Sequence, residues 1–356
     1  HAEYAEALAA FHRYEEAITA AERALTCETI PMGTDRSLFT AEMREELHRR
    51  VGIWRHIMER AAELRISAAV FVRDDVRDMG CWLSNTAVYA DERIVVDTGS
   101  TDGTRALAEK AGGNVIDFAW QDDFAAARNA AIGAVSGDWA VVLDADESFF
   151  APSEVRAYLA MVDVILPHVD AVLLPIVHID EDAGDGEMGR APHVRLLRMG
   201  RGLFYEGRVH EALRKTNGEP VLYHEPAALA IRHVGYSSGR IRTKHERNLA
   251  LMERRIEERG LQPGDCRYLA DTYYGLGKYA AALIYARAAL EESVISVGAQ
   301  SHLHHLLLDA MEQENVPLAQ QMEAARAACH EFPQLPDFYG RLGLLLAACG
   351  DDAALP

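Results

Sequence analysis

Residues 139–147, WAVVLDADE, run from an uninterrupted apolar stretch directly into the carboxylates Asp144, Asp146 and Glu147. Negative charges this close together repel each other. A strand that needed only to end could have used Gly or Asn instead. We therefore interpret the acidic end of this stretch as a binding feature rather than as a turn.

Short apolar runs alternate with helical spacings around this stretch. The strand-like runs are 66–72 (ISAAVFV), 93–97 (RIVVD), 114–118 (NVIDF) and 138–144 (DWAVVLD), and the helical segments between them are 73–90, 104–112 and 124–135. Strands that alternate with helices predict βαβ units, and unbroken apolar runs suit the buried strands of a parallel sheet. The sequence thus predicts an α/β domain whose sheet is covered on both faces.

The regions on either side of these units have different patterns. Residues 1–65 have helical spacing throughout most of their length. Residues 172–234 are rich in irregular strand-like runs, and within them 180–192 (DEDAGDGEMGRAP) is expected to form an exposed loop. The β-rich region therefore extends the α/β domain to about residue 240.

Beyond residue 240 the chain is helical and repetitive. Residues 266–290 (CRYLADTYYGLGKYAAALIYARAAL) combine large residues, a Gly-containing turn and small Ala residues, which is typical of the tetratricopeptide repeat, a helix pair of about 34 residues. A weaker copy covers 302–333, and a third begins at 336. We expect a helical segment at 1–65, an α/β domain at 66–240 and a repeat domain at 241–356.

Composition excludes several classes of protein. The formal net charge of −19 argues against binding to DNA or RNA, and no apolar run reaches the roughly 18 residues of a transmembrane helix. The five cysteines form no CxxC pair, so a disulfide framework or a zinc site is not expected. This use of cysteine fits a reducing, cytoplasmic location. The chain begins at His1 inside a helical pattern, so we expect its natural N-terminus to lie further upstream.

Polar residues follow three of the predicted strands. Arg73 follows the first, while Asp97 and Asp144 end the second and the fourth. Ligands of open parallel sheets bind at the carboxyl ends of the strands, so these side chains are expected to face one crevice. The loop DTGSTDGT at 97–104 is neither a GxGxxG fingerprint nor a P-loop. Carboxylates there suit ribose hydroxyls, a base N–H or a divalent cation.

The ordered motifs of the chain carry a family resemblance. The segments AAVFVRDD, VVDTGSTDGT, WQDDFAAARNAAIGAVSGDWAVVLDADE and GRVHEAL together resemble a glycosyltransferase of family 2 with the GT-A fold, a Rossmann-like fold that binds nucleotide-diphosphate sugars. The subgroup it resembles most carries tetratricopeptide repeats and includes bacterial peptide S-glycosyltransferases. The resemblance covers residues 66–240 and the repeats, and it assigns no motif to the segment before Ile66.

The resemblance implies a role for each acidic strand end. Asp97 would contact the nucleotide base, Arg128 would lie near the nucleotide, and Asp144 would bind the ribose. Asp146 would bind a divalent metal ion, Mg²⁺ or Mn²⁺, and His233 would complete the metal shell. The acidic sequence at 144–147 is thereby read as a donor and metal site.

The resemblance also implies a base and further donor contacts. An inverting reaction needs a base near the acceptor, and GRVHE offers Glu211 with His210 beside it. Asp102 would fasten its loop as well as contact the ligand. The remaining residues expected to bind the nucleotide sugar are Val72, Arg73 and Ala145.

The implied reaction moves a sugar, by resemblance glucose, from a uridine diphosphate donor to an acceptor with inversion at the anomeric carbon. A repeat array offers a surface for an extended peptide, which favours a peptide or protein acceptor at a Cys or Ser side chain, or a homodimer contact. Two other functions stay open. One is transfer to a lipid-linked or lipopolysaccharide acceptor, and the other is a non-catalytic interaction protein.

Each assignment also has a structural alternative. Asp144 and Asp146 could cap a helix that starts near Pro152, and Arg128 could be an ordinary ion-paired helix residue. Glu211 could be a structural carboxylate, and His233 could simply pack at a strand end. Asp122 and Asp123 are interpreted as a helix N-terminal pair, and the histidines at 302, 304 and 305 as repeat packing.

Overall fold

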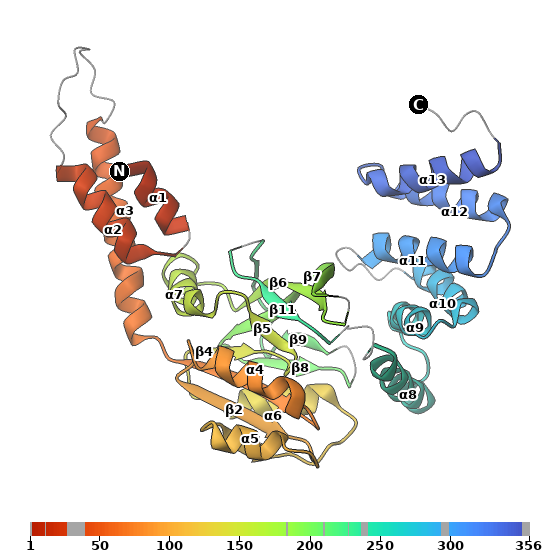
Figure 1. Cartoon of the computed structure of the whole chain (residues 1–356), viewed down its shortest axis with the longest axis horizontal. Coiled ribbons are helices and arrows are strands. Elements are labelled where there is room, and N and C mark those ends of the chain that lie inside the picture. The colour runs from red at the N-terminus through yellow and green to blue at the C-terminus, as the bar shows by residue number, and fades with distance from the viewer. Residues whose placement is uncertain are drawn as a thin grey trace. The chain divides into compact units, whose positions relative to one another are not determined.

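The computed structural model divides into two compact units, His1–Ser237 and Ser238–Pro356 (Figure 1). The structure describes residues 2–10, 12–26, 40–182, 184–208, 211–226, 228–235, 241–292 and 299–350. Among these residues, no helix combines the length and the apolar character that crossing a membrane requires.

The first unit is built on a mixed sheet that has nine strands in the described part of the chain. Its strands run in the order β3-β2-β1-β4-β7-β6-β11-β5, and β10 pairs with β6. The bounds are β1 Ile66–Val72, β2 Glu92–Asp97, β3 Asn114–Asp117, β4 Trp139–Val142, β5 Glu147–Phe149, β6 Ala171–Asp180, β7 Gly186–Arg198, β10 Leu222–His224 and β11 Ile231–His233. Strands β8 (Leu203–Glu206) and β9 (Ala212–Lys215) form a separate hairpin. The predicted α/β fold is confirmed.

Helices cover both faces of the parallel half of the sheet. Helices α4 (Val76–Thr86), α5 (Thr104–Lys110) and α7 (Val155–Ile165) contribute to one core, which contains the inward residues of β1 and β4. Helix α6 (Phe124–Gly133) contributes to the cores of the opposite face. All four residues of β4 are buried, which explains why its sequence lacks polar alternation.

The order in which successive strands are added to the sheet reverses after β3. Strands β1, β2 and β3 follow each other toward one edge, whereas β4 pairs with the other side of β1. The crossover through α6 therefore lies on the face opposite α4 and α5. In open sheets, ligands bind at such a reversal, beyond the carboxyl ends of the strands. Asp97 ends β2 and Asp144 follows β4 at this edge.

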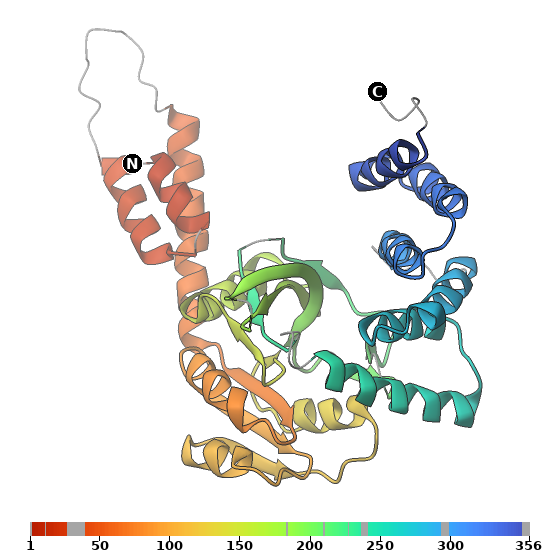
Figure 2. The same ribbon diagram turned by 45° about the vertical axis from the view of Figure 1, so that its right-hand side comes forward.

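The N-terminal helices pack onto the same unit. Helices α1 (Ala2–Ala10), α2 (Tyr14–Thr26) and α3 (Ala41–Glu63) lie side by side (Figure 2). Their buried face shares a core with Ala160 of α7, and Arg60 Nε lies 2.6 Å from Asp163 Oδ2. The described part of residues 1–65 is thus helical, as the sequence predicts, and it is anchored on α7.

One loop prediction was wrong. The expected loop at 180–192 is short, because β7 begins at Gly186 and pairs antiparallel with β6 from Asp180 onward. Most side chains at the start of β7 are exposed. A strand without a buried face has no apolar alternation, which is why its sequence resembles a loop.

In its described residues, 241–292 and 299–350, the second unit is built from helices. They are α8 (Ile241–Arg259), α9 (Asp265–Gly275), α10 (Tyr279–Glu291), α11 (Ala299–Gln313), α12 (Leu318–Glu331) and α13 (Pro336–Ala348). Small residues are buried where α9, α10 and α11 meet, among them Ala270, Ala282 and Ala286. Small side chains at these positions let neighbouring helices approach closely, as tetratricopeptide-like repeats require.

Candidate functional site

The acidic strand ends lie on adjacent parallel strands. Val72, at the end of β1, pairs in register with Asp97 at the end of β2. Asp144 follows β4, which pairs with β1 on its other side. Asp97 and Asp144 thus come from the two strands that flank β1, at the carboxyl edge of the sheet.

Asp97 is nearly buried, with 5% of its surface exposed. Its Oδ1 accepts hydrogen bonds from the N–H groups of Gly99 (3.2 Å) and Ser100 (2.8 Å), and its Oδ2 lies 3.6 Å from Arg105 Nη1. The backbone oxygen of Val72 accepts from Thr98. These bonds fix the β2–α5 loop beside β1 and hold the Asp97 carboxylate in one orientation.

Asp102 fastens two loops together. Its Oδ1 accepts from the N–H of Thr104 (2.8 Å), and its Oδ2 accepts from the N–H of Val76 (3.1 Å), where the loop after β1 meets α4. Asp74, in the loop after β1, makes the reciprocal contact with the loop after β2: its Oδ1 accepts from the N–H of Thr101 at 2.6 Å. The same bond lowers the pKa of Asp74. Both carboxylates have structural partners in these loops, as the interpretation of Asp102 as a loop fastener expects.

The other predicted donor contacts differ in exposure. Val72 and Ala145 are buried side chains of the main core, with 1% and 8% of their surface exposed. Arg73 is exposed, and its N–H donates to Asp75 Oδ2 at 2.9 Å. The side chains of Val72 and Ala145 therefore offer no polar group, and only their backbone atoms could bind a ligand.

Asp144 lies at the centre of a network of charged side chains. Arg128 Nη2 lies 3.0 Å from Asp144 Oδ1, and Arg195 Nη2 lies 3.1 Å from Asp144 Oδ2. Arg195 also donates from Nε and Nη2 to the two oxygens of Glu147, each at 2.7 Å. Arg128 Nε donates to Glu211 Oε1 at 2.8 Å. Two arginines therefore hold both oxygens of Asp144.

The Arg128 guanidinium lies between two aromatic rings. It is 5.3 Å from the ring centroid of Phe71 and 5.3 Å from that of Tyr205. Burial disfavours its charge, but Asp144 and Glu211 outweigh this effect and raise the pKa of Arg128. Its Nη1 is buried without a hydrogen-bond partner in the described structure. Arg128 is thus a buried cation of α6 that forms ion pairs with both Asp144 and Glu211.

Sequence reasoning missed Arg195, and it included Glu147 in the acidic stretch without giving this residue a role of its own. Glu147 is 2% exposed, and one of its oxygens also accepts the N–H of Asp144 at 3.0 Å. Arg195 is 8% exposed and sits in the otherwise apolar run of β7. A charged residue inside a predicted buried strand was the available signal, because such a residue needs a buried partner.

Asp146 and His233 lie side by side. Asp146 Oδ2 is 3.4 Å from His233 Nε2, and the N–H of Val234 donates to the backbone oxygen of Asp146 at 3.1 Å. A Cβ atom built on Gly235 would lie 2.0 Å from Asp146 Oδ2 and 2.6 Å from His233 Nε2. Glycine therefore keeps open the space onto which both side chains face.

The helix-cap alternative for Asp144 and Asp146 is wrong. The short 3₁₀-helix Pro152–Glu154 has Ala151 as its N-cap, and α7 has Glu154. By contrast, Asp123 is the N-cap of α6, because its side chain accepts from the N–H of Ala126 at 2.9 Å. The helix N-terminal interpretation of Asp123 is thus confirmed.

An oxygen and an imidazole nitrogen facing one space suit a divalent cation that completes its shell with water and substrate oxygens. The described residues contain no cluster of three or more His, Cys, Asp or Glu side chains arranged for a metal ion. Protein ligands other than Asp146 and His233 are therefore not evident there.

Glu211 is 15% exposed and contacts Arg128, while its predicted neighbour His210 lies outside the described residues. The histidines of the repeats have local partners. His302 Nε2 lies 2.6 Å from Asp271 Oδ1, His304 Nε2 lies 3.0 Å from Glu331 Oε2, and His305 stacks on Phe338. They serve repeat packing, as predicted.

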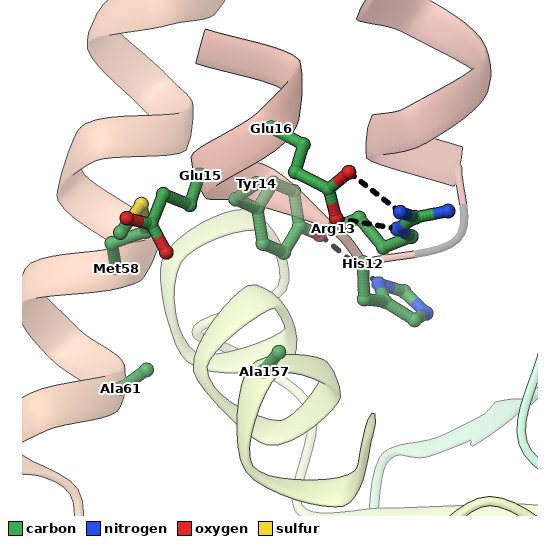
Figure 3. A pocket seen from close by; sticks show the side chains of 8 residues that line it. All are labelled: His12, Arg13, Tyr14, Glu15, Glu16, Met58, Ala61 and Ala157. Carbon is green, nitrogen blue, oxygen red and sulfur yellow. Dashed lines mark hydrogen bonds and ion pairs between the residues drawn. The ribbon is translucent and has the colours of Figure 1, made fainter. Parts of the chain in front are cut away.

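A cavity of about 290 Å³ lies elsewhere in the first unit, between α2, α3 and α7 (Figure 3). Arg13 and Glu16 at its rim pair with each other, and His12 Nδ1 lies 3.1 Å from the Tyr14 hydroxyl. None of the predicted donor or metal residues lines it. The cavity is a feature of the helical packing rather than of the strand ends.

Comparison with known proteins gives a family match within the first unit. Residues 81–172 match the family described as glycosyl transferase family 2. The chain is 32% identical over 198 residues to a TPR repeat-containing protein of Synechococcus elongatus, an alignment that covers 52% of this chain and 45% of that protein. It is 26% identical over 216 residues to the SPbeta prophage-derived glycosyltransferase SunS of Bacillus subtilis, covering 57% and 47%.

The chain spans about half the length of these curated relatives. A solved structure of glucosyl-3-phosphoglycerate synthase from Mycobacterium tuberculosis, in complex with Mg²⁺ and uridine diphosphate, is 19% identical. The alignment covers 34% of this chain and 46% of the synthase chain. Its TM-score of 0.28 is too low to support an inference. The matched segment 81–172 contains Asp97, Asp144 and Asp146, so these carboxylates lie in the part of the chain that is similar to glycosyl transferase family 2.

Proposed function

We propose that this protein is a metal-dependent glycosyltransferase that moves a sugar from a nucleoside diphosphate donor to an acceptor. One observation carries the proposal. Asp97 and Asp144 follow the strands that flank β1, and two residues beyond Asp144 the Asp146 carboxylate faces His233 across 3.4 Å. Carboxylates that share a crevice with an imidazole suit a nucleotide and its cation better than they suit a structural role.

The nucleoside would be recognised by the two strand-end carboxylates. An ionised carboxylate only accepts hydrogen bonds, so Asp97 suits a base N–H and Asp144 suits ribose hydroxyls. Arg128 and Arg195 each bind one oxygen of the Asp144 carboxylate and thereby restrain its rotation. About one third of the Asp144 side chain (34%) is exposed, which leaves part of it accessible to a ligand.

Asp146 and His233 would hold Mg²⁺ or Mn²⁺. When bound, such a cation neutralises the charge that develops on the departing diphosphate. The net charge of −19 makes local positive charge necessary for an anionic donor. Asp146 and His233 thus bring that charge to the crevice, beside the carboxylate that is proposed to hold the ribose.

Glu211 would receive the acceptor proton. Its Oε1 accepts from Arg128, so Oε2 is the oxygen that we assign to the acceptor. A single displacement with Glu211 as the base would invert the anomeric carbon. Because Arg128 also binds Asp144, the arginine fixes the base relative to the proposed ribose site.

The acceptor that we propose is a peptide or protein side chain. The support is the second unit, whose paired helices α9–α10 and α11–α12 with buried alanines resemble arrays that bind extended peptides. The chain would then carry its catalytic domain and an acceptor-binding surface together. Transfer to a lipid-linked acceptor is the alternative outcome of the test below.

The proposal is tested by mass spectrometry of reactions that contain a panel of sugar nucleotides, Mn²⁺, and either peptide or lipid-linked acceptors. We expect donor-dependent transfer that Asp146→Ala abolishes. Glu59→Ala serves as the matched control, because that carboxylate is 75% exposed on α3. Equal activity in the two variants, or no reaction with any donor, would overturn the proposal.

A further inference from the structure

His233 contacts a second histidine through the ring nitrogen that does not face Asp146. His178 Nδ1 lies 2.8 Å from His233 Nδ1, and the rings are nearly perpendicular at 79° with centroids 4.9 Å apart. The two residues are register partners on the adjacent parallel strands β6 and β11. The sheet therefore fixes this contact, because register partners place their side chains on the same face.

Two ring nitrogens at 2.8 Å are held together by a hydrogen, which one of them donates and the other accepts. If His178 donates, His233 carries its proton on Nε2 and presents an N–H toward Asp146. If His233 donates, its Nε2 presents a lone pair toward the same carboxylate. Only the second arrangement allows Nε2 to bind a cation.

We infer that His178 is a positioning residue that holds His233 in its cation-binding tautomer. The inference rests on the proposed function, since it assigns a task within the Asp146–His233 pair. In the loaded arrangement His233 keeps its proton on Nδ1 and donates it to His178 Nδ1, while His178 keeps its own proton on Nε2. Each ring carries one proton in both arrangements, so the protons balance.

The surroundings favour this role over simple packing. Histidines that bind metal ions generally donate their other N–H to an oriented acceptor, which fixes the ring and the tautomer. His233 is 4% exposed, so an unpaired N–H inside the sheet would be costly. His178 contacts His233 at Nδ1, whereas Asp146 and Gly235 lie next to Nε2, so the two ring nitrogens have different neighbours.

The test compares His178→Asn with His178→Leu in the full chain. The Asn amide oxygen occupies roughly the place of His178 Nδ1 and accepts the same hydrogen bond, whereas Leu has similar size and no acceptor. With uridine diphosphate present, isothermal titration with Mn²⁺ should give His178→Asn an affinity within about threefold of the unaltered protein. His178→Leu should bind Mn²⁺ about 10- to 100-fold more weakly.

A spectroscopic measurement reads the tautomer directly. Long-range ¹H–¹⁵N correlation spectra of histidine-labelled protein with Mg²⁺ and uridine diphosphate should show the His233 proton on Nδ1. Finding that proton on Nε2 in the loaded protein would overturn the inference. So would equal Mn²⁺ affinities for the Asn and Leu variants, provided that their melting temperatures match the unaltered protein. By contrast, absence of Mn²⁺ binding in the unaltered protein would refute the proposed metal dependence itself.

Discussion

Arg195 and Glu147 form a buried, bidentate ion pair next to Asp144, the residue that is proposed to bind the ribose. Both bonds are 2.7 Å long, and Glu147 also accepts the N–H of Asp144 at 3.0 Å. The pair therefore ties β7 to the turn that carries Asp144 and Asp146. This turn is held by charge at its centre rather than by apolar packing alone.

Removing one member of this pair should destabilise the protein strongly. Glu147→Gln leaves the buried Arg195 charge with Asp144 as its remaining ion-pair partner, and we expect a loss of about 3–5 kcal/mol in the free energy of unfolding. Urea denaturation of the full chain measures this loss. Glu187→Gln is the matched control, because its pair with Arg190 is exposed and should contribute less than about 1 kcal/mol. A loss below 1 kcal/mol for Glu147→Gln would contradict the assignment.

Arg128→Lys tests the need for a guanidinium at the site. Lysine carries the same charge but cannot reach Asp144 and Glu211 from two fixed nitrogens, so Asp144 should lose its orientation. We expect the affinity for uridine diphosphate, measured by calorimetry, to fall about tenfold, which corresponds to about 1.4 kcal/mol. Arg49→Lys is the control and is expected to leave this affinity unchanged, because that side chain is 61% exposed on α3 and pairs with Glu46.

Glu211→Gln should separate the transfer step from donor binding. The amide keeps the shape and can still accept from Arg128, but it cannot take a proton. Steady-state kinetics should show transfer reduced by about 10²- to 10⁴-fold, with the dissociation constant of the donor changed only a few-fold. Parallel losses in both quantities would instead indicate that Glu211 only holds Arg128 in place.

The second unit should show a histidine-dependent pH effect on stability. The hydrogen bond with Asp271 raises the pKa of His302 above its usual 6.5, so the protonated form contributes stability below about pH 6.5. That contribution is lost as the pH rises through the folded-state pKa. Because the His302 side chain is 56% exposed, we expect only about 0.2–1 kcal/mol. Thermal melts between about pH 5 and pH 9 should show this loss in the unaltered protein and not in His302→Gln.

Much of the fold follows from local patterns in the sequence. Strands β1, β2 and β4 are continuous apolar runs bounded by polar residues, and Asp97 and Asp144 mark where two of them end. Because all parallel strands end at one edge, their meeting place could be predicted without knowing any long-range contact. The same reasoning did not predict the network of charged side chains that holds Asp144 in place.

Residues that act through long-range pairing could not be found in this way. Arg195 reaches Glu147 because β7 pairs antiparallel with β4, and His178 reaches His233 because β6 pairs with β11. Strand β11 has only three residues, which is too short to carry a recognisable pattern. The strands that pair with β11 could therefore be identified only from the structure.

The most direct measurement of the central claim is a crystal structure of the full chain soaked with Mn²⁺ and uridine diphosphate. We predict an anomalous peak for manganese bound by Asp146 and His233, with the ribose hydroxyls on Asp144 and the base on Asp97. Manganese bound elsewhere, or a nucleotide that contacts none of these carboxylates, would contradict the account.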